Sequence, residues 1–66
     1  MRYYTILWTQ VCKIGVNAFI EKDGETTLAA YNEEDAEERF WTTHRKLMPL
    51  GNTGFDIRNI LEGEEV

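Results

Sequence analysis

The segment from Tyr31 to Pro49 constrains the fold of this chain more than any other, because it carries the signals of a single amphipathic helix. Asn32 is a good N-cap, since its side-chain oxygen can accept a hydrogen bond from a free backbone N–H of the first turn. Pro49 disfavours helical geometry at the residue before it, which is Met48. The sequence therefore predicts one helix, which begins after Asn32 and ends at Met48 or one residue earlier.

Charged residues near the two ends agree with this helix. Acidic residues at positions 33–35 place negative charge at the positive end of the helix dipole. Arg45 and Lys46 place positive charge near the other end. Asp35 and Arg39 are four residues apart with the acid nearer the N-terminus, which is the favourable order for an ion pair. Dipole and pairing thus favour the same helix as the cap.

Apolar spacing predicts which faces of the helix are buried. At about 100° per residue, one narrow stripe contains Ala36, Phe40, Thr43 and Leu47. Trp41 and Met48 lie roughly 100° from the centre of that stripe, with His44 between the two groups. Two interpretations stay open. Either all these residues belong to one wide core stripe, or a second apolar strip meets another chain, and that strip is Trp41, His44 and Met48.

The length of 66 residues allows one domain. We expect residues 1–61 to form a single α+β domain and residues 62–66 to be a mobile acidic tail. Hydrophobic residues make up 42% of the chain, which is ample for a core and argues against disorder. A chain of this size buries only about 60% of its unfolded surface, so it is marginally stable alone. Oligomerisation would compensate, and we therefore expect a homodimer.

Charge and cysteine content limit the compartment and the partners. The formal net charge is −5, which a phosphate backbone would repel, so nucleic acid is disfavoured as a partner. Cys12 is the only cysteine, and the N-terminus does not resemble a secretion signal. No apolar run approaches the roughly 20 residues of a spanning helix. These features predict a cytoplasmic protein that is not embedded in a membrane.

Three segments before the helix have the character of strands. Residues 2–10 are rich in β-favouring side chains and apolar on both faces, which is typical of a central strand or of a strand with a covered outer face. Residues 11–20 alternate with a period of two, although no strong turn separates them from the first strand. Asp23–Gly24 is the clearest turn signal, because a tight two-residue hairpin needs positive φ angles. Residues 26–31 would then return as the third strand.

A final strand is predicted over residues 55–61, with a bulge or strand end where Ile60 and Leu61 break the alternation. The order is β-β-β-α-β, an α+β fold in which one helix packs on one face of a mixed, mainly antiparallel sheet of about four strands. The last strand–helix–strand unit should cross over right-handed and make its two strands parallel. The other face of the sheet has no cover within the chain, and an uncovered apolar face marks an interface.

No combination of residues predicts chemistry. A catalytic thiol would need Cys12 activated by a base such as His44, but Cys12 falls in an alternating apolar strand where cysteine is usually inert packing. One cysteine and one histidine are too few for a zinc site. Residues 51–54 lack the lysine of a phosphate loop and precede a strand. We therefore expect no catalytic residue, no metal and no cofactor, and a protein that is not an enzyme.

Two resemblances to known proteins are present, and the first covers about half of the chain. Residues 30–36, between a predicted hairpin and the Phe55–Arg58 segment, resemble the small ribosomal LX-type proteins. Such an RNA-bound protein is expected to be basic, and this chain is acidic, so no function is carried over. The chain is also similar in style to the short acidic proteins of phages and mobile elements, many of which bind and regulate a host protein.

The sequence favours a non-enzymatic protein-binding module, such as a small regulator, inhibitor or accessory subunit that acts by occlusion. Aromatic anchors would supply affinity and acids would steer a basic partner. The candidate residues are Trp41, His44, Met48, Glu34, Glu37 and Glu38. One alternative is an acidic mimic of nucleic acid that blocks a DNA- or RNA-binding protein. Another is a small-molecule-binding or catalytic oligomer with sites between subunits.

Overall fold

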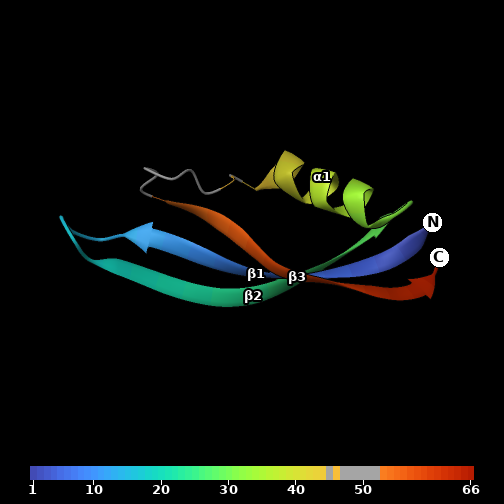
Figure 1. Cartoon of the computed structure of the whole chain (residues 1–66), viewed down its shortest axis with the longest axis horizontal. Coiled ribbons are helices and arrows are strands. Elements are labelled where there is room, and N and C mark those ends of the chain that lie inside the picture. Colours follow the sequence, from blue (N-terminus) through green and yellow to red (C-terminus); the bar gives the residue numbers. More distant parts are fainter. Residues whose placement is uncertain (45, 47–52) are drawn as a thin grey trace.

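The computed structural model describes residues 1–44, 46 and 53–66. Its elements follow in the order β1 (Arg2–Lys13), β2 (Phe19–Ala30), α1 (Glu33–Thr43) and β3 (Thr53–Glu65). The three strands form one sheet in the order β2-β1-β3, and α1 lies against one face of it (Figure 1). The two termini meet at one end of the sheet, where the Val66 N–H donates to the Met1 carbonyl at 3.1 Å. The α+β class is therefore as predicted.

The described part of the chain contains three strands, so the prediction of about four is wrong. The predicted second strand is divided: residues 11–13 continue β1, and residues 19–20 begin β2. Between them the chain reverses, and the Ile14 N–H donates to the Ala18 carbonyl at 2.9 Å. Period-two alternation describes strand character but carries no information about where the chain reverses. The two halves of this hairpin therefore have the sequence pattern of one strand.

The prediction of a turn at Asp23–Gly24 is also wrong. Both residues lie within β2, where Gly24 pairs with Trp8 of β1 and no glycine of the described chain has a positive φ. A Cβ at position 24 would collide with Cη2 and Cζ2 of the Trp8 indole. Trp8 is held in place by a 2.9 Å hydrogen bond from Nε1 to Thr26 Oγ1. Glycine is therefore required at position 24 because the Trp8 ring approaches the backbone closely. Close approach of another group is a known reason for glycine within a strand.

β1 is the central strand, as its two apolar faces predict, and both of its neighbours are antiparallel to it. β2 and β3 therefore run in the same direction, but they occupy opposite edges of the sheet and do not pair. The connection through α1 passes over β1 rather than joining adjacent strands. The one parallel pairing in the described chain is an isolated bridge between Lys46 and Phe55. The predicted mixed sheet is thus an antiparallel sheet with that single bridge.

The helix begins as predicted, with Asn32 Oδ1 accepting from the Asp35 N–H at 2.8 Å. It ends at Thr43 rather than near Met48. His44 has extended backbone angles, φ −123° and ψ 143°, and its N–H donates to the Phe40 carbonyl at 3.0 Å. The Thr43 hydroxyl also donates to that carbonyl at 3.2 Å. Hydrogen bonds from the Thr43 side chain and the His44 backbone thus satisfy the Phe40 carbonyl in the last turn. The helix therefore ends several residues before Pro49.

The core lies between α1 and the face of the sheet that it covers. Its buried members are Tyr4, Ile6, Ala30, Ala36 and Phe40. Two of the four residues in the predicted buried stripe, Ala36 and Phe40, have no exposed surface. Thr43, the last residue of α1, is exposed, and Leu47 lies outside the described residues. Trp8, Phe55 and other half-buried side chains complete this core.

β3 is longer and less regular than predicted. The pairing with β1 shifts between Leu7 and Trp8, which pair with Asn59 and Ile57, so Arg58 is an extra residue. This shift explains why the apolar alternation changes phase before Ile60, somewhat earlier than the predicted break. At its end the strand includes Glu62–Glu65, the segment predicted as a tail, and Glu65 pairs with Arg2.

Candidate protein-binding surface

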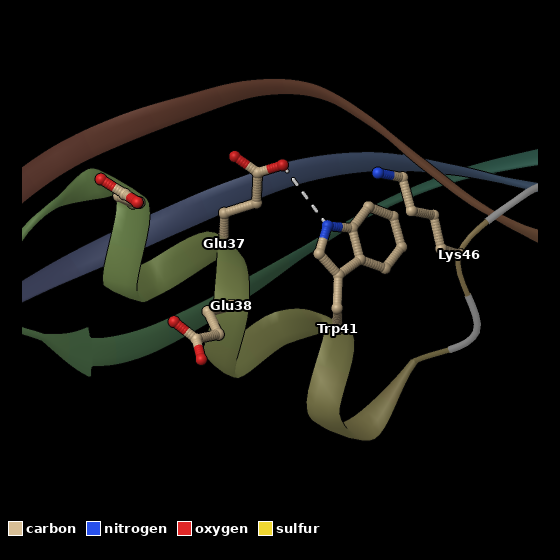
Figure 2. Close-up of a pocket in the computed structure, with 5 residues that line it drawn as sticks. Glu37, Glu38, Trp41 and Lys46 are labelled. Carbon is tan, nitrogen blue, oxygen red and sulfur yellow. Dashed lines mark hydrogen bonds between the residues drawn. The ribbon is translucent and has the colours of Figure 1, made fainter.

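The outer side of α1 forms an open pocket of about 340 Å³. Its walls are Glu34, Glu37, Glu38, Trp41 and Lys46 (Figure 2). The first four lie at spacings of three or four residues, so successive helical turns bring them to one side of α1. Lys46 follows the helix and is placed by its backbone bridge to Phe55 of β3. The pocket therefore joins the helix to the segment that leads back to the sheet.

Trp41 forms the aromatic wall of the pocket. The side chain is half-buried and its ring meets Phe40 edge-on, with centroids 5.0 Å apart. Its Nε1–H donates to Glu37 Oε1 at 3.4 Å, a bond that fixes the ring direction (Figure 2). The Lys46 ammonium lies 5.8 Å from the indole centroid, within the range of a cation–π contact. The indole thus contacts Phe40 of the core and has the Lys46 ammonium over its ring.

His44 lies apart from this pocket, although the sequence groups it with Trp41. Its ring stacks on Phe40 at 4.1 Å between centroids and meets Phe55 edge-on at 4.7 Å. Its Nδ1 lies 3.1 Å from the Phe40 carbonyl and 2.9 Å from the Thr43 hydroxyl. These contacts give His44 a structural role at the end of the helix. Helical spacing stops applying once the helix has ended, which is why the predicted strip separates.

Of the six candidate residues, four line the pocket, His44 packs on the core, and Met48 lies outside the described residues. Sequence reasoning missed Lys46 as a pocket residue and assigned it only to the helix dipole. No spacing rule could place it, because its position depends on the bridge to β3.

The acids of the pocket carry unpaired negative charge. Within the described residues, the ion pairs are Arg2–Glu62, Arg39–Asp35 and Arg58–Asp23. None of them involves Glu34, Glu37 or Glu38, all of which are exposed. The predicted Asp35–Arg39 pair is present at 2.8 Å. It joins the first turn of α1 to the second and leaves the acids on the pocket side available to a basic group.

Asp35 itself is held in its charged form. The backbone N–H of Tyr31 and the guanidinium of Arg39 donate to Asp35 Oδ2 at 3.0 Å and 2.8 Å. These bonds hold the pKa of the Asp35 carboxyl below its ordinary value of 3.8. Because the pKa is lower in the folded state, the contribution to stability is complete above the unfolded value. It is lost as the pH falls through the lower, folded value.

Asp35→Asn is accordingly expected to lower stability at pH 7 and to matter progressively less in acid. The measurement is the urea midpoint of both proteins between pH 7 and pH 2. The gap between the two midpoints should narrow below pH 3.8, the ordinary value. The control is Glu33→Gln, which removes a first-turn acid that takes no part in these two hydrogen bonds. A gap that stays constant down to pH 2 would contradict the assignment.

The sheet face opposite α1 has no cover from the described chain. Tyr3 and Leu61 lie on it with 44% and 47% of their surface exposed. Polar contacts cross the same face: Thr9 Oγ1 donates to Asp23 Oδ1 at 2.6 Å, and Arg58 lies 3.8 Å from that carboxylate. The face is therefore mixed, with apolar side chains toward the termini and a polar group in the middle.

The far end of the β1–β2 hairpin carries a second group of exposed apolar residues. These are Ile14, Val16, Phe19 and Ile20. Val16 is 86% exposed. The period-two alternation of residues 11–20 predicts a strand and does not predict that these side chains are exposed. Gly15 was the available signal, because glycine favours a turn. Residues next to a turn lie at the end of a hairpin, where no further strand covers them.

The described residues show no other reactive arrangement. Cys12 is a half-buried free thiol in β1, paired with Ile20 and Thr53. Within residues 1–44, 46 and 53–66, no three His, Cys, Asp or Glu side chains lie together as metal ligands would. In the same residues, no helix is both long and apolar enough to cross a bilayer.

Comparisons with protein families, with curated proteins and with solved structures find no match to this chain.

Proposed function

We propose that the protein is a non-enzymatic protein-binding module that acts as a small regulator, inhibitor or accessory subunit. The observation that carries this proposal is the outer pocket of α1, in which Glu34, Glu37, Glu38 and Trp41 converge. Partly buried aromatic side chains are the residues from which binding energy at protein interfaces most often comes. Unpaired acids around such an anchor steer association toward a basic surface.

The size and shape of the fold support the same proposal. One helix covers one face of a three-stranded sheet, which leaves Tyr3 and Leu61 exposed on the other face. Apolar surface that stays exposed on a small domain is commonly contact area for another chain. A homodimer formed through this second face is part of the proposal. So is a cytoplasmic location, which the free thiol of Cys12 favours.

Mimicry of nucleic acid is a second candidate, favoured by one observation. Along α1, Glu33, Glu34, Glu37 and Glu38 are all exposed and have no ion pair among the described residues. A row of acids of this kind can occupy the basic groove of a DNA- or RNA-binding protein. The two candidates differ in what holds the partner: an aromatic anchor in the first, and charge alone in the second.

The test is affinity capture from a lysate of the native host, comparing the natural chain with Trp41→Ala. Removal of the anchor is expected to reduce recovery of the partner at least about tenfold, the effect of truncating a strong interface residue. Circular dichroism should show that the variant stays folded. The matched control is Val16→Ala, because Val16 is exposed on the distant hairpin and lies outside the pocket.

Two outcomes would overturn the proposed surface. Equal recovery by Trp41→Ala and the natural chain rejects the aromatic anchor. If recovery instead survives Trp41→Ala but disappears in Glu34→Lys with Glu38→Lys, and falls steeply with added salt, the nucleic-acid mimic replaces the binding module.

A further inference from the structure

We infer that the pocket on α1 receives a cationic side chain of the partner, an arginine in preference to a lysine. This inference rests on the proposed function, because it names the chemical group by which a protein partner would be held. The pocket presents three carboxylates, from Glu34, Glu37 and Glu38, beside one indole face. A cation placed there would meet negative charge at the rim and the electron-rich face of a ring.

The position of Lys46 shows that the indole face accepts a cation. Its ammonium lies 5.8 Å from the ring centroid while its backbone is bridged to Phe55. The Lys46 residue is exposed, and among the described residues it has no ion pair. A long, exposed lysine side chain can leave the ring by rotating about its own bonds. We therefore assign Lys46 as an internal occupant that a partner cation displaces.

Arginine fits this pocket better than lysine for two reasons. Its planar guanidinium stacks on an aromatic face, whereas an ammonium is a compact point charge. Its five N–H donors form a fork that can bond carboxylates on two sides at once. The volume of about 340 Å³ lies at the small end of ligand pockets, so one long side chain is a more suitable occupant than a cofactor.

Glu37 has a specific part in this arrangement. Its Oε1 accepts from the Trp41 Nε1–H at 3.4 Å, and Figure 2 shows this carboxylate beside the indole nitrogen. The carboxylate thus orients the indole and adds charge beside it. Glu34 and Glu38 supply charge alone, since the Trp41 Nε1–H donates to Glu37 and, among the described residues, to neither of them.

The test is an NMR titration of the purified full chain with a blocked tripeptide that has one central arginine. The readout is the indole N–H resonance of Trp41, and the indole of Trp8 provides an internal reference in the same sample. Trp8 donates to Thr26 inside the sheet, so its resonance should not respond. We expect a saturable shift at Trp41 only, with a dissociation constant in the millimolar range for so small a ligand.

Four variants of the experiment sharpen the assignment. Lys46→Ala should bind the arginine tripeptide about threefold more tightly, because the internal cation is gone. Glu34→Gln with Glu38→Gln should bind it about threefold more weakly at low salt. The same tripeptide with citrulline, which is neutral and nearly the same shape, should give no saturable shift. The lysine tripeptide should bind more weakly than the arginine tripeptide.

Contrary results are equally defined. Absence of a saturable Trp41 shift in Lys46→Ala overturns the pocket, and equal binding of the citrulline tripeptide overturns the role of charge. Tighter binding of lysine than arginine overturns the preference. If the tripeptide binds but no partner is captured from the host lysate, the pocket stands and the proposed function fails. If capture depends on Trp41 while the tripeptide does not bind, the proposed function stands and this inference fails.

Discussion

Phe40→Ala is expected to lower the free energy of unfolding by about 3–5 kcal/mol, the range for truncation of a buried aromatic side chain. Phe40 has no exposed surface and is the largest fully buried side chain among the described residues. Its ring meets Phe55 edge-on at 6.1 Å and carries the stacked ring of His44 at 4.1 Å. Truncation would therefore leave a cavity where α1 meets the sheet and remove the ring on which His44 stacks.

The effect should be close to complete loss of the fold. Domains of this size have a total stability of only about 5 kcal/mol, because so little surface is buried. We expect circular dichroism of Phe40→Ala at 25 °C to show a largely unfolded chain, and the natural chain to unfold in one cooperative transition. Phe40→Leu, which keeps most of the volume, should stay folded with a lower urea midpoint.

Val16→Ala provides the matched control, because its side chain is 86% exposed at the end of the hairpin. Substitutions at such positions change stability by no more than about 0.5 kcal/mol. If Phe40→Ala and Val16→Ala had similar urea midpoints, α1 would not be packed on the sheet as described. The candidate surface would then lose the scaffold that positions Trp41.

The start of the helix and the grouping of its acids could be predicted because both depend on local chemistry. Asn32 caps a helix wherever the chain turns, and the i, i+3, i+4 spacing brings Glu34, Glu37 and Trp41 to one side of any helix that contains them. The same rules failed at the other end. Hydrogen bonds to the Phe40 carbonyl end the helix at Thr43, so His44 leaves the predicted strip for the core.

The strand arrangement could not be predicted, because it depends on contacts between residues far apart in the sequence. Alternation over residues 11–20 is compatible with one strand or with two halves of a hairpin, and only the pairing of Lys13 with Phe19 decides between them. Lys46 reaches Trp41 through a bridge to β3, which no spacing along the chain can foresee. The turn predicted at Asp23–Gly24 is the most instructive error. The Asp-Gly pair is a strong local turn signal, but Gly24 lies within β2, where it pairs with Trp8 and contacts its ring.

Gly24→Ala is the second substitution with a large expected effect, and it tests that contact directly. Replacing glycine by alanine within a strand should by itself gain about 0.5–1 kcal/mol. The new Cβ would, however, collide with the Trp8 ring, and overpacking of this kind costs about 1–3 kcal/mol. We therefore expect a net loss of up to about 2.5 kcal/mol in the free energy of unfolding, measured by urea denaturation.

A loss of stability alone would not separate this contact from a turn with positive φ, because alanine is unfavourable there too. The distinction comes from Trp8→Phe, whose shorter ring lacks the Cη2 and Cζ2 atoms that meet position 24. In that background the cost of Gly24→Ala should fall to less than about half, the coupling expected of residues in contact. Gly15→Ala is the glycine control, since its Cβ would meet only the Ala18 Cβ at an ordinary 3.6 Å. An equal cost of Gly24→Ala with and without the tryptophan would mean that backbone geometry, and not the ring, requires glycine in β2.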